Sequence, residues 1–440
     1  MSRLRLRTAA VSQGASSLVF PETMSHLLRK RISLPRGRIR RLVTVYAGSW
    51  IGGATAGMVL AIAALAPGGE LPQAVPVEGE PFGARLVAVD SEWQLTFDGE
   101  SGRRVMPAAE LVRWGRFAEV VRGPVLVLAD GGLLTGAVYG VDKERLTADS
   151  DLFGPVKLPL EQVAGVVFEL PADRHARDLR FDRVGRATGD SDLLILNNGD
   201  EVAGRLEHID DTRIRLAAAV GPVDVEVHRV RALVFNPALL ARREPRGLRA
   251  MAGFADGSRL VADRLELSGQ SLRIDVAGAQ RWTTAAEDLI GLQPRGGRVT
   301  YLSDLPVADD RHVPFLDLPW PYQTDRSVSG AWLRAGGRLY LKGLGVHSAA
   351  RLTYLLDEPY RRFEAELAVD DETAGQGSVR FRVFVDGRVK HTSPTVRGRE
   401  PPVPISVHLS DAKRLDLVVD FADRADVEDH ADWLDARLVP

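Results

Sequence analysis

The chain of 440 residues contains no cysteine. This absence excludes disulfide bonds, thiolate-ligated metals and cysteine nucleophiles, although it does not identify the cellular compartment. Aromatic residues make up only 6% of the chain, and the formal net charge is −2. Proteins that bind nucleic acids need basic patches and aromatic stacking platforms, so we expect no nucleic-acid partner.

The familiar catalytic motifs are also missing. The sequence has no Gly-x-Ser-x-Gly elbow and no His-Glu-x-x-His, and the glycine-rich segment 342–348 lacks the Lys-Ser/Thr ending of a phosphate loop. Carboxylates are abundant, so residue types alone do not exclude a glycosidase. Glycosidases place these carboxylates in a large barrel or propeller, for which the short repeats in the middle of this chain leave no room. We therefore expect binding rather than catalysis, and no enzyme.

What the sequence does contain is typical of a globular protein rich in strands. Hydrophobic residues make up 45% of the chain and charged residues 26%, which are ordinary values for folded proteins. The chain is longer than a typical domain with a single hydrophobic core, so about two to four domains are expected. The 42 glycines and 25 prolines, between short apolar runs, indicate frequent turns. We predict an all-β protein.

The N-terminal region differs from the rest of the chain. A basic segment, residues 1–41, precedes residues 42–66, which contain no charged residue. The uncharged run is long enough to cross a bilayer, and we predict a hydrophobic helix that acts as a signal peptide or transmembrane anchor. Cleavage after Ala66 would place Pro67 directly after the cut, which favours the uncleaved anchor. We expect an exported protein that is membrane-anchored, periplasmic or extracellular.

Two alternatives remain for this region. The first is that the uncharged run is a buried helix of the soluble fold, but its glycines weaken any helix in water. Translation from Met24 would give a shorter leader with the same basic-then-apolar order.

A proline-rich linker, residues 67–81, leads to a middle region, residues 82–298, in which one pattern recurs. An apolar strand meets an Asp-Gly or Asn-Gly pair, and a second strand follows. Such pairs accept the positive φ of a tight hairpin turn, so each copy is predicted to be a small antiparallel meander or barrel. The predicted units are residues 82–120, 125–170, 193–237 and 249–295.

The spacing of strands and turns gives these units a faint resemblance to Sm-like or SH3-like small barrels. RNA binding does not follow from it, because acidic residues crowd the copy at 193–237 and aromatic residues are few. We interpret the middle region as a scaffold or spacer. Self-association through exposed strand edges is the alternative.

The last third of the chain, residues 299–440, also shows strand patterns. Residues 377–385 and 388–392 alternate apolar and polar residues on either side of Asp386-Gly387, as in a β-hairpin. Residues 415–421 form another strand with one apolar face. These patterns predict a two-sheet β-sandwich.

Five motifs follow one another in this region. They are Trp320-Pro321-Tyr322, Lys-Gly-Leu-Gly-Val-His-Ser at 342–348, Val-Asp-Asp-Glu at 369–372, Gly-Ser-Val-Arg-Phe-Arg-Val at 377–383 and Asp-His-Ala-Asp-Trp-Leu-Asp-Ala at 429–436. In this order they resemble the NPCBM family of carbohydrate-binding modules, which is often appended to glycoside hydrolases. The resemblance covers about Val299–Pro440. It implies a galactose-binding-like jelly-roll sandwich whose partner is a carbohydrate or cell-surface glycan.

Sugar recognition needs an aromatic platform and polar groups in a fixed geometry. Histidines can donate or accept hydrogen bonds with sugar hydroxyls, but they equally suit a structural role between loops. Trp433 equally suits core packing, whereas Trp320 lies in a rigid, proline-flanked segment where exposure is expected. The candidate ligand-binding residues are Trp320, Tyr322, His347, Asp371, His430 and Trp433.

Acidic residues gather at two places in the same region. Asp370 follows a predicted strand, and Asp429 and Asp432 stand three residues apart near the C-terminus. Clustered carboxylates suit Ca²⁺, so these three are candidate calcium ligands. The alternative is that they cap turns and accept hydrogen bonds from loop amides.

The sequence as a whole predicts a non-catalytic carbohydrate-binding protein, exported or membrane-anchored. It would recognise glycans through its C-terminal sandwich, by aromatic stacking and hydrogen bonds. The alternative is a structural or assembly protein of the cell envelope, in which the sandwich binds a protein partner and no sugar.

Overall fold

The computed structural model describes residues 70–142, 144–241, 247–276, 281–315 and 318–440. The predicted basic segment and hydrophobic helix, residues 1–66, lie outside this range. Within it, no helix is both long and apolar enough to span a membrane. Residues Ala66–Pro440 form one compact unit.

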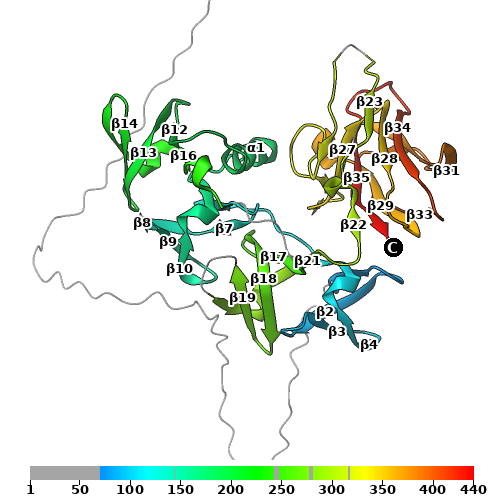
Figure 1. Cartoon of the computed structure of the whole chain (residues 1–440), viewed down its shortest axis with the longest axis horizontal. Helices are drawn as coiled ribbons and strands as arrows, with labels where there is room; N and C mark the ends of the chain where they lie inside the picture. The colour runs from blue at the N-terminus through cyan, green and yellow to red at the C-terminus, as the bar shows by residue number, and fades with distance from the viewer. Residues whose placement is uncertain (1–69, 143, 242–246, 277–280, 316–317) are drawn as a thin grey trace, which may run out of the picture. The chain divides into compact units, whose positions relative to one another are not determined.

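Strands make up nearly all of the regular structure (Figure 1). Among the described residues there is one α-helix, α1 (Arg174–Gly185). The prediction of an all-β protein is confirmed, with this helix as the exception.

The middle region contains four antiparallel meanders. The first consists of β1 (Gln73–Pro76), β2 (Phe82–Val89), β3 (Gln94–Gly99), β4 (Gly102–Pro107) and β5 (Leu111–Gly115). The second consists of β6 (Val125–Leu128), β7 (Leu133–Thr135), β8 (Ala137–Val141), β9 (Arg145–Ser150), β10 (Gly154–Pro159) and β11 (Val163–Val167). The third consists of β12 (Asp192–Leu196), β13 (Glu201–Ile209), β14 (Arg213–Ala218), β15 (Gly221–Glu226) and β16 (Val230–Val234). The fourth consists of β17 (Arg249–Phe254), β18 (Arg259–Ser268), β19 (Ser271–Val276), β20 (Trp282–Ala285) and β21 (Leu289–Arg295).

Each meander closes on itself. In the first, β1 pairs with both β2 and β5. In the others the first strand pairs directly with the last, β6 with β11, β12 with β16 and β17 with β21. A single turn of 3-10 helix precedes the last strand every time. The units are not isolated from one another, because β11 also pairs with β16 and β21 with β5. In the second unit, β8, β9 and β10 form a separate three-stranded sheet.

The predicted hairpin turns are confirmed. Gly131, Gly199 and Gly257 all have positive φ, at 86°, 94° and 91°. In each turn the preceding Asp or Asn side chain accepts a backbone N–H two residues ahead, which stabilises the turn locally. These hydrogen bonds join Asp130 to Gly132 at 2.9 Å, Asn198 to Asp200 at 3.1 Å and Asp256 to Ser258 at 2.8 Å.

The C-terminal region is the predicted two-sheet sandwich. One sheet contains β22 (Thr300–Tyr301), β24 (Gln323–Thr324), β27 (Gly343–His347), β29 (Arg362–Val369), β33 (Val403–His408) and β35 (His430–Val439). The other contains β23 (Asp309–His312), β28 (Ala350–Leu355), β30 (Ser378–Val385), β31 (Arg388–Thr392), β32 (Val396–Arg397) and β34 (Arg414–Phe421). A two-stranded hairpin, β25 (Arg334–Ala335) with β26 (Arg338–Leu339), lies outside both sheets.

The core of the sandwich is built from alternate residues of facing strands. Phe363 on β29, Phe381 on β30 and Trp433 on β35 are fully buried. The ring of Trp433 meets Phe381 edge-on, with 4.9 Å between the ring centroids. Period-two alternation in each strand sends these side chains to the same interior.

The sequence analysis missed α1. Asp173 caps its N-terminus, because its carboxylate accepts the backbone N–H of Ala176 at 2.8 Å. The buried residues Arg177, Asp178, Phe181 and Val184 lie on one face. Two of these are charged, so the face has no clear apolar periodicity, and the usual sequence signal of a helix is weak.

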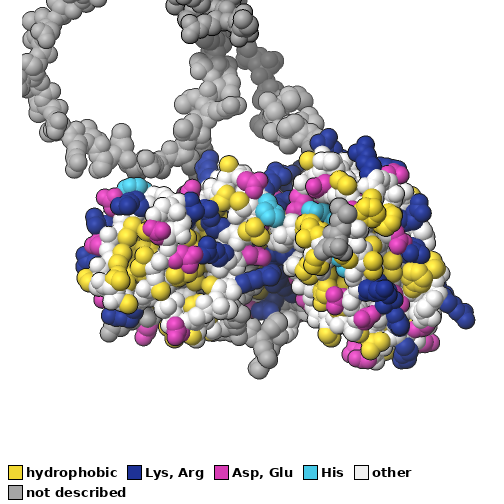
Figure 2. Space-filling view, turned by 90° about the horizontal axis from the view of Figure 1, so that it is seen from above, with side chains coloured by type: hydrophobic (Ala, Val, Ile, Leu, Met, Phe, Trp, Pro, Cys, Tyr) yellow, Lys and Arg dark blue, Asp and Glu magenta, His cyan; other side chains and the backbone are white. Residues whose placement is uncertain are grey.

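Buried ion pairs join α1 and the meanders to the sandwich. Asp178 on α1 accepts from the Arg334 guanidinium at 2.6 Å, and Glu119 accepts from the same group at 2.6 Å. Asp182 on α1 pairs with Arg326. Acidic and basic side chains are otherwise interspersed over the face drawn in Figure 2, in keeping with the net charge of −2.

Asp178→Ala is expected to lower the free energy of unfolding by about 3–5 kcal/mol, because it leaves Arg334 buried without its innermost partner. Asp178 is fully buried, and it also accepts the backbone N–H of Trp332 at 3.0 Å. Urea unfolding of the purified chain measures the loss. Asp224→Ala, which removes the partner of two arginines on the exposed face of β14, is the control and should cost far less. Equal losses for the two variants would contradict the importance of the buried pair.

Candidate functional site

Three histidines and a tryptophan meet at one end of the sandwich. His347 ends β27 and His430 begins β35, and the antiparallel register places them directly opposite each other. His312 ends β23 in the other sheet. Trp320 follows in the loop after β23. We call these four residues the histidine cluster.

Aromatic contacts hold the cluster together. The Trp320 indole stacks on the His347 imidazole, with 5.2 Å between centroids and an interplanar angle of 9°. Its centroid is also 5.3 Å from that of His430. The rings of His312 and His430 are 5.8 Å and 5.7 Å from His347. The backbone N–H of Trp320 donates to Nδ1 of His312 at 3.2 Å, which fixes the loop against β23.

The pKa values of two histidines in the cluster are shifted in opposite directions. Burial lowers the pKa of His347 to about 4, and the neighbouring His430 and His312 add to the effect. Burial would also lower the pKa of His430, but the hydrogen bond and charge of Glu372 outweigh it and raise this pKa. Nδ1 of His430 lies 2.7 Å from the Glu372 carboxylate. At neutral pH His347 is therefore a neutral imidazole, while Glu372 stabilises the cationic form of His430.

Glu372 is held in place by its own partners. It accepts a hydrogen bond from the Ser329 hydroxyl at 2.6 Å. Burial alone would raise the pKa of Glu372, but the hydrogen bonds from His430 and Ser329 lower it. His175 on α1 lies 3.7 Å from the same carboxylate. The carboxylate is thus ionised and oriented toward His430.

Two nitrogens of the cluster are buried without a partner. They are Nε2 of His312 and Nδ1 of His347. A buried polar atom without a hydrogen bond is unfavourable by about 1–3 kcal/mol, so both positions favour a ligand that can hydrogen-bond. Trp320 beside them is half-buried. Phe315 and Leu318, in the same loop, expose 59% and 60% of their surface, which adds an apolar rim.

The structure brings only some of the predicted ligand-binding residues together. Trp320, His347 and His430 form the cluster. Tyr322 is half-buried and packs against the sandwich core. Asp371 accepts the backbone N–H groups of Gly336 and Gly337, at 3.1 Å and 2.8 Å, and so holds the β25–β26 hairpin.

The prediction for Trp433 needs correction. Its side chain is fully buried, with rings of Phe363 and Phe381 packed against it. Because β35 runs through the middle of its sheet, the alternating side chains point into the sandwich. Trp433 therefore has no exposed face on which a sugar could stack. Its role is core packing, which was the alternative that the sequence left open.

Sequence reasoning missed His312, Glu372 and Ser329. His312 stands outside the matched motifs, so no local pattern marks it. Glu372 belongs to the acidic motif at 369–372, in which Asp370 was predicted as a calcium ligand and Asp371 as a sugar-binding residue. Only the pairing of β23 with β28 brings His312 near His347.

Two of the three candidate calcium ligands, Asp370 and Asp429, accept hydrogen bonds from backbone amides. Asp370 accepts from the backbone N–H groups of Glu372 and Arg334, at 2.8 Å and 3.0 Å. Asp429 accepts from the backbone N–H of Ser378 at 2.8 Å. Burial is the largest cause that raises the pKa of Asp370 and of Asp429 to about 6. Burial and the charge of Asp370 raise the pKa of Asp432 well above its usual range.

A metal site is not evident from this geometry. Within the described residues, no group of three or more His, Cys, Asp or Glu side chains is arranged to hold a metal ion. Backbone amides supply the partners that the turn-capping alternative requires for Asp370 and Asp429, whereas both carboxylate oxygens of Asp432 are buried without a hydrogen bond. Calcium binding by Asp370, Asp429 and Asp432 stays a prediction.

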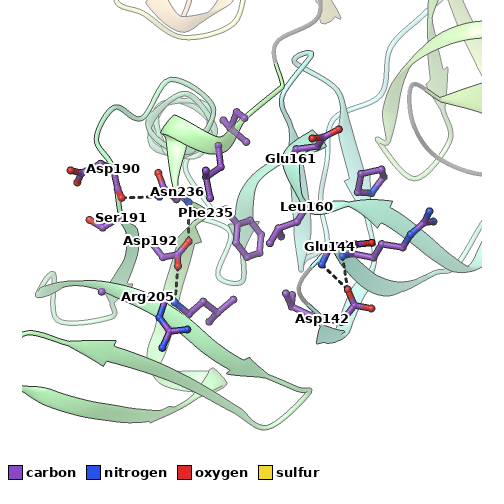
Figure 3. Close-up of a pocket in the computed structure, with 17 residues that line it drawn as sticks. Asp142, Glu144, Leu160, Glu161, Asp190, Ser191, Asp192, Arg205, Phe235 and Asn236 are labelled. Carbon is purple, nitrogen blue, oxygen red and sulfur yellow. Dashed lines mark hydrogen bonds between the residues drawn. The ribbon is translucent and has the colours of Figure 1, made fainter.

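A separate cavity of about 870 Å³ lies between the second and third meanders (Figure 3). Two of its carboxylates are engaged by backbone amides of the protein. Asp142 accepts the backbone N–H groups of Glu144 and Arg145. Asp192 accepts those of Leu206 and Asn236. Because these carboxylates stabilise loops, the histidine cluster is the better candidate site.

Glu372→Gln is expected to lower the pKa of His430, because the neutral amide removes the charge that stabilises the imidazolium while the ring stays buried. NMR titration of the histidine side chains measures the change. His347 should titrate near pH 4 in both proteins. Glu358→Gln, on an exposed loop, is the control. A His430 pKa that is the same in Glu372→Gln and in the wild type would contradict the assigned pairing.

Comparisons with known proteins agree with the resemblance drawn from the motifs. Residues 298–439 match the family model of the NPCBM/NEW2 domain. A protein of Renibacterium salmoninarum, provisionally named an endo-alpha-N-acetylgalactosaminidase, is 33% identical over 110 residues, which are 25% of this chain and 7% of that protein. Alpha-1,3-galactosidase B of Akkermansia muciniphila is 33% identical over 115 residues, 25% of this chain and 14% of that protein. The matched segment thus spans a small part of both relatives.

One solved structure is similar over the same region. It is CBM51 from Clostridium perfringens GH95 in complex with methyl-galactose, 28% identical, with a TM-score of 0.29. The match covers 32% of this chain and 99% of that one. The family match is specific to the C-terminal region, and residues 298–439 are an NPCBM/NEW2 domain.

Proposed function

We propose that the NPCBM/NEW2 domain binds a neutral glycan residue at the histidine cluster, without catalysing its conversion. The observation that carries the proposal is the pair of buried, unpartnered nitrogens on His312 and His347 beside the half-buried Trp320. Sugar rings have an apolar face that packs on an indole and hydroxyls that reach adjacent polar atoms. The cluster offers both within one site.

The charge state of the cluster supports a neutral ligand. A neutral imidazole has one donor and one acceptor nitrogen, and a sugar hydroxyl can pair with either. His430 is already paired with the Glu372 carboxylate at 2.7 Å, so its imidazole does not require an anionic ligand. The proposed binding therefore rests on hydrogen bonds and aromatic packing rather than on charge.

The relatives support a galactose-type glycan. One curated relative is named for action on a galactoside and the other for action on N-acetylgalactosaminide linkages. Both are enzymes by name, but this chain matches only a small share of each. We therefore propose that the shared domain serves recognition in this chain, and that glycan binding localises the protein.

The N-terminal sequence supports export. A basic segment followed by an uncharged run, residues 42–66, is the order of a signal peptide or membrane anchor. Export would place the domain where glycans occur. An envelope assembly protein that binds other proteins is the alternative, and the exposed side chains of Phe315 and Leu318 would suit such a partner.

Trp320→Ala and His347→Ala are each expected to weaken binding of a methyl galactoside by roughly threefold to tenfold. The estimate follows from about 0.5–1.5 kcal/mol for an aromatic contact or a hydrogen bond. Isothermal titration calorimetry with the purified chain measures the dissociation constants, after a glycan array has selected the tightest ligand.

Tyr139→Ala is the matched control, because Tyr139 is an aromatic side chain 51% exposed on β8, in the middle region. It should bind the glycan like the wild type. Circular dichroism must show that all variants remain folded. If the folded Trp320 and His347 variants bind as tightly as the wild type, the site is elsewhere. If the wild type binds no glycan on the array, the assembly alternative gains support.

N-terminal sequencing of the chain after expression with its own N-terminus tests export. An uncleaved anchor is expected to leave the chain in the membrane fraction, with a start upstream of residue 42. A start at Pro67 would show a cleaved signal peptide. Recovery from the cytosol with an intact N-terminus would contradict export.

A further inference from the structure

A cavity of about 420 Å³ lies between the meanders, α1 and the loop that precedes the hairpin β25–β26. It is distinct from the histidine cluster, because none of the cluster residues lines it. Apolar residues such as Leu133, Met251 and Leu341 form part of its wall. Its charged lining includes Arg186, Arg259, Arg295, Arg326, Asp130 and Asp182.

Arg259 is the unusual member of this set. The side chain is 5% exposed and lines the cavity. Among the described residues, it forms no ion pair with a carboxylate and its guanidinium donates no hydrogen bond to another side chain. Burial lowers its pKa, and the charge of Arg326 adds to the effect. An uncompensated buried cation is unfavourable, so the position favours an anion.

An aromatic stack holds the guanidinium of Arg259 in place. It lies 3.9 Å from the centroid of the Trp332 ring. Trp332 in turn stacks on Phe181 of α1, with 5.4 Å between centroids and an interplanar angle of 4°. Cation–π contact stabilises the charge without using the N–H groups of the guanidinium. Those N–H groups remain available to a ligand.

The nearby carboxylates already have partners. Asp182 binds Arg326 through two hydrogen bonds, at 2.5 Å and 2.9 Å. Asp325 accepts from Lys342 at 2.8 Å. Asp178 is occupied by Arg334 and by the backbone N–H of Trp332. None of them is free to neutralise Arg259.

We propose that this cavity binds a small molecule through one carboxylate, which accepts two hydrogen bonds from the Arg259 guanidinium. The planar fork of arginine matches a carboxylate in this way. A cavity of this volume holds a ligand of about monosaccharide size, such as a uronic acid. The apolar wall contacts the uncharged part of the ligand.

The charge of the cavity favours a monoanion over phosphate. Among the described residues, two arginines of the lining, Arg259 and Arg295, form no ion pair, and one aspartate, Asp130, forms none either. These three groups leave one positive charge to be neutralised, so a second negative charge on the ligand would find no partner and would be repelled by Asp130. A dianion such as inorganic phosphate at neutral pH should therefore bind more weakly than a carboxylate.

Thermal unfolding and calorimetry of the purified chain test the proposal, with D-glucuronate, acetate and inorganic phosphate at the same ionic strength and pH 7. D-glucuronate is expected to raise Tm and to bind more tightly than acetate, which lacks the sugar ring. Phosphate is expected to bind more weakly than either. Arg259→Met should weaken glucuronate binding by at least tenfold.

Two further readouts separate ligand binding from a structural role of Arg259. Without ligand, Arg259→Met should have a Tm equal to or above that of the wild type, because an unpaired buried charge is removed. Arg259→Lys, which keeps the charge but loses the fork, should bind glucuronate more weakly than the wild type. Arg205→Met removes an exposed arginine on β13 and should change neither Tm nor binding.

Several outcomes would overturn the proposal. One is that neither glucuronate nor acetate raises Tm. Another is that Arg259→Met binds glucuronate as tightly as the wild type. The third is that phosphate binds more tightly than glucuronate. A lower Tm of Arg259→Met without ligand, together with no binding in the wild type, would assign Arg259 a purely structural role. If Arg259→Met does not fold, the glucuronate affinity of Arg259→Lys tests the proposal instead, and an affinity equal to that of the wild type would contradict it. Because the histidine cluster is not involved, Trp320→Ala should bind glucuronate normally.

Discussion

The buried guanidinium of Arg334 is the constraint on which much of the structure depends. A charge inside a protein is tolerated only with partners, and Arg334 takes them from α1 and from Glu119. Its backbone N–H donates to Asp370, and Asp370 accepts the backbone N–H of Glu372. Glu372 in turn sets the charge of His430. A continuous series of polar contacts thus leads from the helix to the histidine cluster.

The arrangement separates two kinds of recognition by their electrostatics. At the histidine cluster, Glu372 is paired with His430, and the unpartnered groups are imidazole nitrogens of His312 and His347 that suit hydroxyls. In the cavity beside α1, the buried guanidinium of Arg259 has no carboxylate partner among the described residues, which suits a ligand carboxylate. Together the two sites would let one chain contact a glycan with both neutral and acidic sugars.

The sequence predicted the strand-rich fold and the sandwich well, because both rest on local patterns. Asp-Gly and Asn-Gly pairs demand turns with positive φ, which Gly131, Gly199 and Gly257 adopt. Helix α1 escaped prediction because its buried face includes Arg177 and Asp178, which are buried only through partners distant in the sequence. For the same reason its role as the anchor of the sandwich was not foreseen.

The sequence by itself determined the alternation of strands and turns, the identity of the C-terminal domain and the presence of Trp320, His347 and His430 in its motifs. Only the tertiary structure decided which of these side chains meet, since His312 reaches them through strand pairing in the other sheet. It also decided that Trp433 lies in the core and that Arg259 is buried without a carboxylate partner. Such outcomes depend on contacts between residues far apart in the chain, which the local periodicity of the sequence does not predict.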